Sequence, residues 1–164
     1  MNNMCTLELA MSSDFDDYLC LKSEPSNIYW SGFSSAPERE KLKQHFLAAL
    51  NNKTRDVYLL KESEKVIGYL YIDYLLEGNT AELAYGISEL QAGRGLAKLM
   101  IGFALEKIPS DIDIQIAWIA ESNIPSIKTI EALGFNNTAD VEYRDLAQFT
   151  SKVKFTKFTR NNKN

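Results

Sequence analysis

Three β-type segments in a row, followed by a glycine-rich turn and a helix, constrain the fold of this chain most strongly. Residues 55–61 and 65–74 are rich in β-branched and aromatic side chains and flank the short polar turn 62–64, which predicts a β-hairpin. Residues 81–87 predict a third strand, and residues 94–107 predict a helix with one apolar face. Strands that lead directly into a helix favour an α/β fold.

The N-terminal part of the chain predicts one strand and two helices. Residues 4–11 alternate apolar and polar side chains, as a strand does, and Ser13 precedes several acidic residues, as at a helix start. Residues 27–35 predict a loop. A second helix is expected from Ser35, whose spacing to Glu38 is that of a capping box with a proline in the first turn. Its apolar residues share one face: Leu42, Phe46, Leu47 and Leu50.

The C-terminal part predicts a strand, a short helix and two more strands. Residues 111–120 alternate like a strand, and Asn123 is placed to cap a helix that Gly134 ends. Residues 137–143 and 147–158 complete the pattern. The order βααβββαβαββ is that of an α/β sandwich, with helices packed on a mixed sheet.

Length and composition limit the possible functions. The 164 residues contain no linker or repeat and predict a single domain at residues 1–158, with a polar tail at residues 159–164. The 18 basic and 22 acidic residues give a net charge of −4, which argues against a nucleic-acid partner. No apolar run reaches the ~18 residues of a membrane helix, and the N-terminus has no signal-peptide pattern. A cytoplasmic protein without a membrane partner is expected.

Few side chains suit metal or nucleophilic chemistry. Cys5 and Cys20 are not spaced as a metal or redox pair, and His45 is the single histidine. This composition disfavours a zinc site and a Ser-His-Asp triad, so no metal is expected. His45 is interpreted as a partly buried structural residue. The chemistry must then use carboxylates, hydroxyls, backbone groups or a bound cofactor.

The segment 85–97 carries the clearest indication of function, because it leads from a strand through a glycine-rich turn into a helix. The first turn of a helix has unpaired N–H groups and a partial positive charge, and Gly93 and Gly95 would let a diphosphate approach them closely. Arg94 adds positive charge. The segment lacks the Gly-Lys-Ser/Thr of a P-loop and the third glycine of a dinucleotide fingerprint. Alone, it fits a simple left-handed turn equally well.

This loop resembles the acyl-CoA loop of the GCN5-related N-acetyltransferase (GNAT) superfamily, which reads Arg/Gln-x-x-Gly-x-Gly/Ala between a strand and a helix. Gly95 and Ala97 match its last two positions. Ala92 stands at the Arg/Gln position, which is a departure, and Gln91 lies one residue earlier. The departure leaves the backbone amides, or Gln91, to take the role of the missing side chain.

A second motif strengthens the resemblance. The helix opened by Asn123 and closed by Gly134-Phe135 is similar to the second GNAT signature, and both motifs occur in the family's order. The resemblance covers nearly the whole chain. It implies a mixed, mostly antiparallel central sheet flanked by about four helices, in which the strands at 81–87 and 111–120 splay apart to form the acyl-CoA cleft.

The resemblance implies an N-acetyltransferase that moves an acetyl group from acetyl-CoA, its co-substrate, to a primary amine by direct attack on the thioester. Residues matching the family's cofactor contacts are Gly86, Ile87, Ala92, Gly93, Arg94, Gly95, Leu96, Ala97, Asn123 and Ser126. Relatives are often dimers, which makes a homodimer one expectation. The acceptor is expected to be a small-molecule or peptide amine.

Glu82 is the candidate catalytic base, at the place where histone-acetylating relatives carry their catalytic glutamate. An ammonium group has no lone pair and must lose a proton before it attacks. Strand alternation puts Glu82 on the face opposite Leu83. An ordinary surface carboxylate is the alternative. Glu121 and Asp73 are further candidates, although Asp73 is expected to pair with a polar neighbour.

The general acid is left open. Many relatives place a proton-donating tyrosine where this chain has Ile130. Three alternatives stay open: Tyr85, Tyr143 or water takes that role, the thiolate leaves without an acid, or catalysis has been lost. A catalytically degenerate acyl-CoA-binding sensor or partner protein is therefore the alternative function, and a CoA-independent structural module is a third.

The resemblance places the acceptor site between the first two helices and the late strands. The residues that can line it there are Tyr29, Trp30, Phe33 and the 143–144 region. Ordinary core packing is the alternative role for these aromatic side chains.

Overall fold

A computed structural model describes residues 4–162, which form one seven-stranded sheet with five α-helices. The sheet order is β1-β2-β3-β4-β5-β7-β6, and every neighbouring pair is antiparallel except β4–β5. The strands are β1 (Cys5–Leu9), β2 (Arg55–Glu62), β3 (Lys65–Leu75), β4 (Thr80–Ile87), β5 (Ile114–Ala120), β6 (Asn136–Arg144) and β7 (Val153–Asn161). The helices are α1 (Phe15–Lys22), α2 (Pro25–Ser31), α3 (Arg39–Leu50), α4 (Leu96–Lys107) and α5 (Ile124–Ala132), with 3₁₀ turns at Ser12–Asp14 and Glu89–Gln91.

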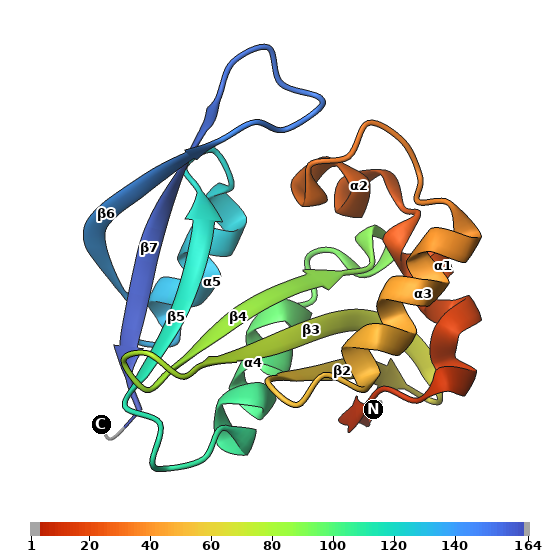
Figure 1. The fold of residues 1–164 in the computed structure, drawn as a ribbon, viewed down its shortest axis with the longest axis horizontal. Helices are drawn as coiled ribbons and strands as arrows, with labels where there is room; N and C mark the ends of the chain where they lie inside the picture. Colours follow the sequence, from red (N-terminus) through yellow and green to blue (C-terminus); the bar gives the residue numbers. More distant parts are fainter. Residues whose placement is uncertain (1–3, 163–164) are drawn as a thin grey trace.

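Helices cover both faces of the sheet (Figure 1). On one face, α4 and α5 pack against the central strands, with Met100 and Ile130 fully buried among strand residues. On the other face, α1 and α3 cover β2 and β3. Because β2 and β3 are covered on both sides, their central residues are buried continuously instead of alternating.

The central elements confirm the sequence predictions. β2 and β3 form the expected hairpin, and the strand before the glycine-rich loop and the helix after it lie at the expected places. The apolar face of α3 also packs as expected, with Phe46 buried beside Leu42, Leu47 and Leu50. The mostly antiparallel mixed sheet confirms the predicted fold class.

The segment between α1 and α3 corrects the prediction of a loop at residues 27–35. Residues 25–31 form α2, which starts with Pro25 in its first turn and ends at Gly32 in the left-handed region at φ +85°. Residues 4–162 therefore contain five α-helices, where about four were expected. The capping box expected at Ser35 is also wrong, since α3 begins at Arg39 with Glu38 as its N-cap and no side-chain cap bond.

Three further expectations are corrected. His45 is exposed on α3 instead of partly buried, because the buried face of that helix is the one with Phe46. The last strand begins at Val153 instead of residue 147, since residues 145–152 form a loop. β7 continues to Asn161, so residues 159–161 pair with β5 and do not form a polar tail.

Candidate active site

β4 and β5 pair along only part of their length. Their parallel register runs from Thr80 opposite Ile114 to Leu83 opposite Ala117 and then stops, although β4 continues to Ile87. Figure 1 shows the two strands diverging beyond this point, so that β5, β7 and β6 form one arm and β1 to β4 the other. This divergence confirms the predicted splayed strand pair.

Backbone groups of β4 line the gap. The amide of Ser88 donates to Ile67 O in β3 (2.8 Å), whereas Asn79 O accepts from Asp113 N on the β5 side (3.0 Å). Hydrogen-bonding direction alternates along a strand, so the amides of Tyr85 and Ile87 point toward the gap and that of Gly86 points toward β3. The sequence prediction of a backbone contact is therefore geometrically available at Ile87, but the Gly86 amide faces the other way.

Gly86 instead permits a close approach of α2. A Cβ atom there would lie 2.5 Å from Asn27 Oδ1 and 2.5 Å from a ring carbon of Tyr69. The buried Asn27 donates from Nδ2 to Leu21 O (3.0 Å) and to Ile87 O (3.5 Å). α2 is thereby fixed against the end of β4, and the carbonyl of Ile87 is already paired.

The turn between β4 and α4 is held from the same side. Glu24 accepts from the Ser88 hydroxyl (2.8 Å) and from the Glu89 amide (2.7 Å). Sequence analysis did not identify Glu24 or Asn27 as positioning residues, because no motif marks them and residues 27–35 were interpreted as a loop. Only the spatial contact between α2 and the 88–95 turn reveals their role.

The start of α4 is open and has no side-chain cap. Gly93 and Gly95 have φ of +83° and +70°, and no heavy atom lies within 4 Å of a Cβ built at either position. Backbone N–H groups at such a helix start are suited to an anion. Ala92 and Gly95 are exposed, whereas the side chain of Leu96 is buried in the core and leaves only its backbone for a ligand.

Arg94 points toward the β2–β3 hairpin. Its guanidinium donates to both oxygens of Glu62, at 2.6 and 3.1 Å, and also to Gln91. This bidentate pair lowers the pKa of Glu62 through the hydrogen bond from Arg94. Arg94 would have to leave Glu62, or share it, to contact a ligand at Gly95.

Asn123 and Ser126 lie on the other wall of the gap, at the start of α5. Asn123 Oδ1 accepts from the Ser126 amide at 3.4 Å, so Asn123 acts as the N-cap. The Ser126 hydroxyl lies 2.6 Å from the Tyr85 hydroxyl, and burial raises the pKa of Tyr85 to about 12. Ile130, one turn further along α5, is fully buried.

Glu82 lies on the opposite face of β4, as strand alternation predicts. It is partly buried, and its side chain has no hydrogen bond or ion pair to any other residue in the described range 4–162. Burial, and secondarily the charge of Asp73, raises the pKa of Glu82. Asp73 itself forms a bidentate pair with Arg55 at 2.6 and 2.9 Å, whereas Glu121 is exposed beyond the end of β5. Glu82 is thus the unpaired carboxylate on this face.

The face with Glu82 is roofed by contacts between the two arms. Trp30 of α2 and Trp118 of β5 both pack against the apolar cluster that contains Phe155, and the ring centres of Tyr29 and Phe149 in the 145–152 loop lie 4.9 Å apart. The main chain joins them further, since Ala147 N donates to Gly32 O at 3.1 Å. Phe33 and Tyr143, two of the residues expected to line this site, are instead largely exposed.

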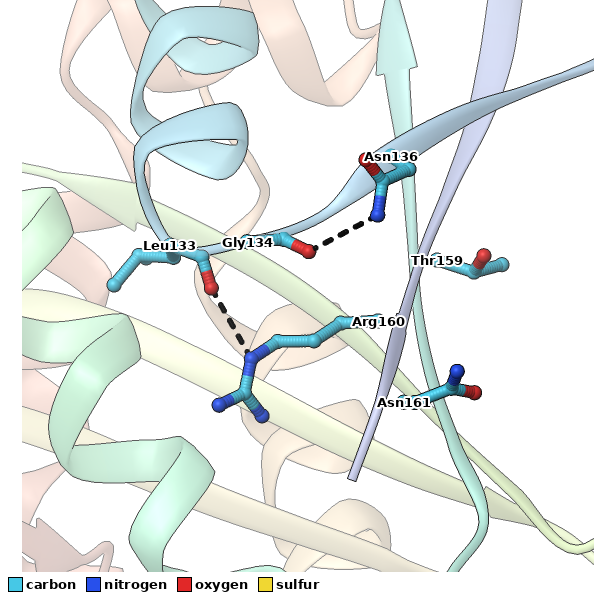
Figure 2. Close-up of a pocket in the computed structure, with 6 residues that line it drawn as sticks. All are labelled: Leu133, Gly134, Asn136, Thr159, Arg160 and Asn161. Atoms are coloured by element: carbon cyan, nitrogen blue, oxygen red, sulfur yellow. Dashed lines mark hydrogen bonds between the residues drawn. The ribbon is translucent and has the colours of Figure 1, made fainter. Parts of the chain in front are cut away.

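A polar cavity of about 270 Å³ lies at the far end of α5 (Figure 2). Arg160 spans it, donating to Leu133 O at 3.1 Å and to the buried Gln115 Oε1 at 2.7 Å. Figure 2 shows Thr159 and Asn161 directed to the other side of β7, so the polar groups do not converge. Arg160 is a structural residue that satisfies the carbonyl of Leu133, the C-cap of α5.

Other classes of site are absent from the described part of the chain. Within residues 4–162, no group of three histidine, cysteine, aspartate or glutamate side chains is arranged to hold a metal ion. No helix in the same range is long and apolar enough to span a membrane.

A shallow, mainly apolar groove of about 410 Å³ begins at Gly95 and follows α4 past Leu99 to Phe103.

Comparisons with known proteins agree with this geometry. A family model described as an acetyltransferase (GNAT) domain matches residues 5–136. A spermidine N-acetyltransferase from Vibrio cholerae, solved with CoA and spermine, superposes with a TM-score of 0.85 at 14% identity, covering 99% of this chain and 98% of that one. A ribosomal-protein-alanine N-acetyltransferase from Brucella melitensis gives 0.80 at 17% identity, covering 95% and 99%.

A further similar structure, the putative acetyltransferase yncA from Salmonella typhimurium with acetyl-CoA, gives a TM-score of 0.75 at 18% identity, covering 98% of this chain and 95% of that one. No curated protein matches the chain in a sequence search. At these identities the solved structures show the shared fold alone, whereas the family model covers most of the sequence. The chain belongs to the GNAT acetyltransferase family.

Proposed function

We propose that this protein is an N-acetyltransferase that transfers an acetyl group from acetyl-CoA to a primary amine. The observation that carries the proposal is the parting of β4 from β5 beyond Leu83 and Ala117, with the uncapped start of α4 beside it. Acetyl-CoA supplies the activated acetyl group. The following roles are assigned to the protein's own residues.

Backbone groups are the proposed cofactor contacts. The backbone amides of residues 92–97 suit the diphosphate of acetyl-CoA. Gly93 and Gly95 have no Cβ atoms, so a diphosphate can approach these amides closely. The amide of Ile87, directed into the gap, suits a strand-like contact with an extended ligand arm. It can equally donate to a thioester oxygen on which negative charge develops. Asn123 and Ser126 border the gap from α5.

Glu82 is the proposed base. It lies on the roofed face of the sheet, has a raised pKa because it is partly buried, and has no ion-pair partner in residues 4–162. A carboxylate whose pKa is raised toward neutrality accepts a proton more readily than an ordinary surface carboxylate. This role fits an ammonium acceptor, which must be deprotonated before attack.

Tyr85 is the proposed hydrogen-bond donor to the departing thiolate. Side chains on a helix lean toward its N-terminus, so a tyrosine at position 130 would reach the level of Ser126, where the Tyr85 hydroxyl lies. A hydroxyl with a pKa of about 12 keeps its proton against a thiolate, whose conjugate acid has a pKa of ~8.5. Its proposed role is therefore charge stabilisation by hydrogen bonding, without complete proton transfer.

The decisive experiment is incubation with acetyl-CoA and a broad panel of amines, following free thiol and the mass of the product. Amine-dependent thiol release together with an acetylated product is expected. Binding of CoA by calorimetry without turnover of any amine would support the alternative, an acyl-CoA-binding sensor. That alternative has one observation in its favour, the buried Ile130 at the position of the usual tyrosine. Absence of CoA binding would exclude both.

A further inference from the structure

The charged side chains around Glu82 can be identified from strand register. Asp73 lies opposite Glu82 on β3, and Ile116 lies opposite it on β5. Trp118, two residues beyond Ile116, faces Lys157 on β7. Side chains alternate between faces, so Asp73, Glu82, Trp118 and Lys157 project from the same face of the sheet.

Arg144 joins this group from β6. Its guanidinium carbon lies 4.2 Å from the ring centre of Phe155 and 5.9 Å from that of Trp118. Its Nε donates to Glu142 at 2.5 Å, and its two terminal nitrogens have no protein partner in residues 4–162. The terminal nitrogens of Arg144 are therefore hydrogen-bond donors available next to Trp118 and Phe155, on the face that also carries Glu82.

Ion pairing removes most of the negative charge on this face. Arg55 binds Asp73 at 2.6 Å and Arg144 binds Glu142 at 2.5 Å. Glu82 and Lys157 have no ion-pair partner in the described chain. One carboxylate without an ion pair, Glu82, is thus left for an acceptor, together with the ammonium group of Lys157 and the free edge of Arg144. Lys22 adds a second ammonium group without an ion pair on this face, where it donates to Ser31 Oγ at 3.2 Å and to the Tyr69 hydroxyl at 3.4 Å.

This balance favours one class of amine over another. A polyamine brings several ammonium groups, each of which loses favourable hydration and needs a carboxylate in return. Only Glu82 is free to supply one, while Lys157 and Arg144 would repel the remaining charges. An amine that also carries a carboxylate matches both signs, because Lys157 or Arg144 can pair with its anionic group.

The roof limits the size of the acceptor. Trp30, Trp118 and Phe149 belong to one apolar cluster, and Gln148 Nε2 donates to Phe33 O at 2.8 Å. These contacts join α2 to the 145–152 loop, which connects β6 and β7 in the other arm of the sheet. Contacts at this place would obstruct the surface of a folded protein more than they would obstruct a small molecule.

We infer that the acceptor is a small amino carboxylate, held with its amine at Glu82 and its carboxylate at Lys157 and Arg144, and not a polyamine. This inference rests on the proposed acetyltransferase function and adds the substrate class. It differs from the substrate named for the similar spermidine N-acetyltransferase from Vibrio cholerae, with which this chain shares 14% sequence identity.

Matched amines test the inference. Initial rates with acetyl-CoA are compared for phenylalanine and phenethylamine, for lysine and cadaverine, and for spermidine and spermine. We expect kcat/KM to be ~10–100-fold higher for each amino acid than for its decarboxylated partner, because hydrogen bonds to charged groups have this effect. Lys157→Met should remove most of that preference by raising KM for the amino acids alone.

Lys154→Met is the matched control, since Lys154 lies on the same strand but projects from the opposite face. It should leave the preference unchanged. Faster transfer to spermine than to any amino acid would overturn the inference while upholding acetyl transfer. Equal loss with Lys157→Met for carboxylated and decarboxylated amines would also overturn it. Absence of transfer to every amine would instead overturn the proposed function, and the inference with it.

Discussion

The hydroxyl of Tyr85 lies 2.6 Å from Oγ of Ser126, joining β4 to the first turn of α5 where β4 and β5 no longer pair. Tyr85 is partly buried there, and burial raises its pKa to about 12. A hydrogen bond between the two walls of the gap thus occupies the level that a tyrosine at position 130 would reach. This hydrogen bond therefore contributes both to the stability of the fold and to the proposed transfer reaction.

Tyr85→Phe should therefore affect both stability and rate. Loss of the hydroxyl leaves the Ser126 hydroxyl without its partner and should lower the free energy of unfolding by about 1 kcal/mol. Acetyl transfer should slow by at least ~10-fold while the Kd for CoA changes little. Urea denaturation, calorimetry and steady-state kinetics measure the three quantities.

Ser126→Ala, combined with Tyr85→Phe, should show non-additive effects on the free energy of unfolding. Additive effects would mean that the two hydroxyls act independently.

Glu82→Gln should lower kcat by ~10²–10⁴-fold, the usual contribution of a general base. In the unmodified protein kcat/KM should rise with pH through the raised pKa of Glu82, since the ionised form is the base. The variant should lose this rise. Glu77→Gln, in the exposed β3–β4 turn, is the control and should retain it. An unchanged pH profile in Glu82→Gln would remove Glu82 from the mechanism.

Glu82→Gln should raise the free energy of unfolding at neutral pH, although it lowers kcat. Because the folded pKa of Glu82 is raised, the folded state binds more protons than the unfolded state between the two pKa values, and the free energy of unfolding falls as pH rises through that window. Glu82→Gln should thus be more stable than the unmodified protein at neutral pH. The difference should vanish below about pH 4, where the carboxyl is protonated in both states.

Glu62→Gln should tighten CoA binding. Glu62 holds Arg94 at 2.6 Å, so weakening this pair frees the guanidinium for a diphosphate at Gly95. We expect a decrease in Kd of a few-fold, measured by calorimetry at fixed ionic strength, and an increase with Arg94→Gln. If Glu62→Gln leaves Kd unchanged while Arg94→Gln raises it, the Glu62 pair does not compete with the ligand.

Two glycine substitutions should have opposite effects. Gly86→Ala would place its Cβ 2.5 Å from Asn27 Oδ1 and 2.5 Å from the Tyr69 ring, which should destabilise the fold by ~1–3 kcal/mol. Gly102→Ala, on α4, meets no atom within 4 Å and should stabilise by up to ~1 kcal/mol through helix propensity. Thermal denaturation of both variants tests the pair. Equal effects would mean that α2 can move away from Gly86.

Local patterns were sufficient to predict the central part of the fold. The hairpin 55–75 and the helix after the glycine-rich turn follow from periodicity and turn residues, which depend on neighbours in sequence. α2 was missed although Pro25 and Gly32 mark its ends, because its aromatic residues were interpreted as a loop. The 145–152 loop was merged into a strand, since its contacts with α2 are distant in sequence.

The candidate site likewise contains residues that local patterns predict and residues that only tertiary contacts reveal. Glu82 and the glycines at the start of α4 were predicted from strand alternation and a local motif, and the structure places them as expected. The pairing of Arg94 with Glu62, and the support from Glu24 and Asn27, depend on tertiary contacts that no spacing reveals. The functional roles of all these residues remain predictions.

The contact between Gly32 and Ala147 closes the two arms of the sheet into a ring. At its base the arms are joined by four residue pairs of β4 and β5, and at its top by the 145–152 loop. The space between the arms can widen only if the 145–152 loop becomes longer or if one of these two connections breaks. Insertion of residues into this loop should therefore widen the space between the two arms while the wall side chains stay unaltered, and under the proposed function this would admit bulkier acceptors.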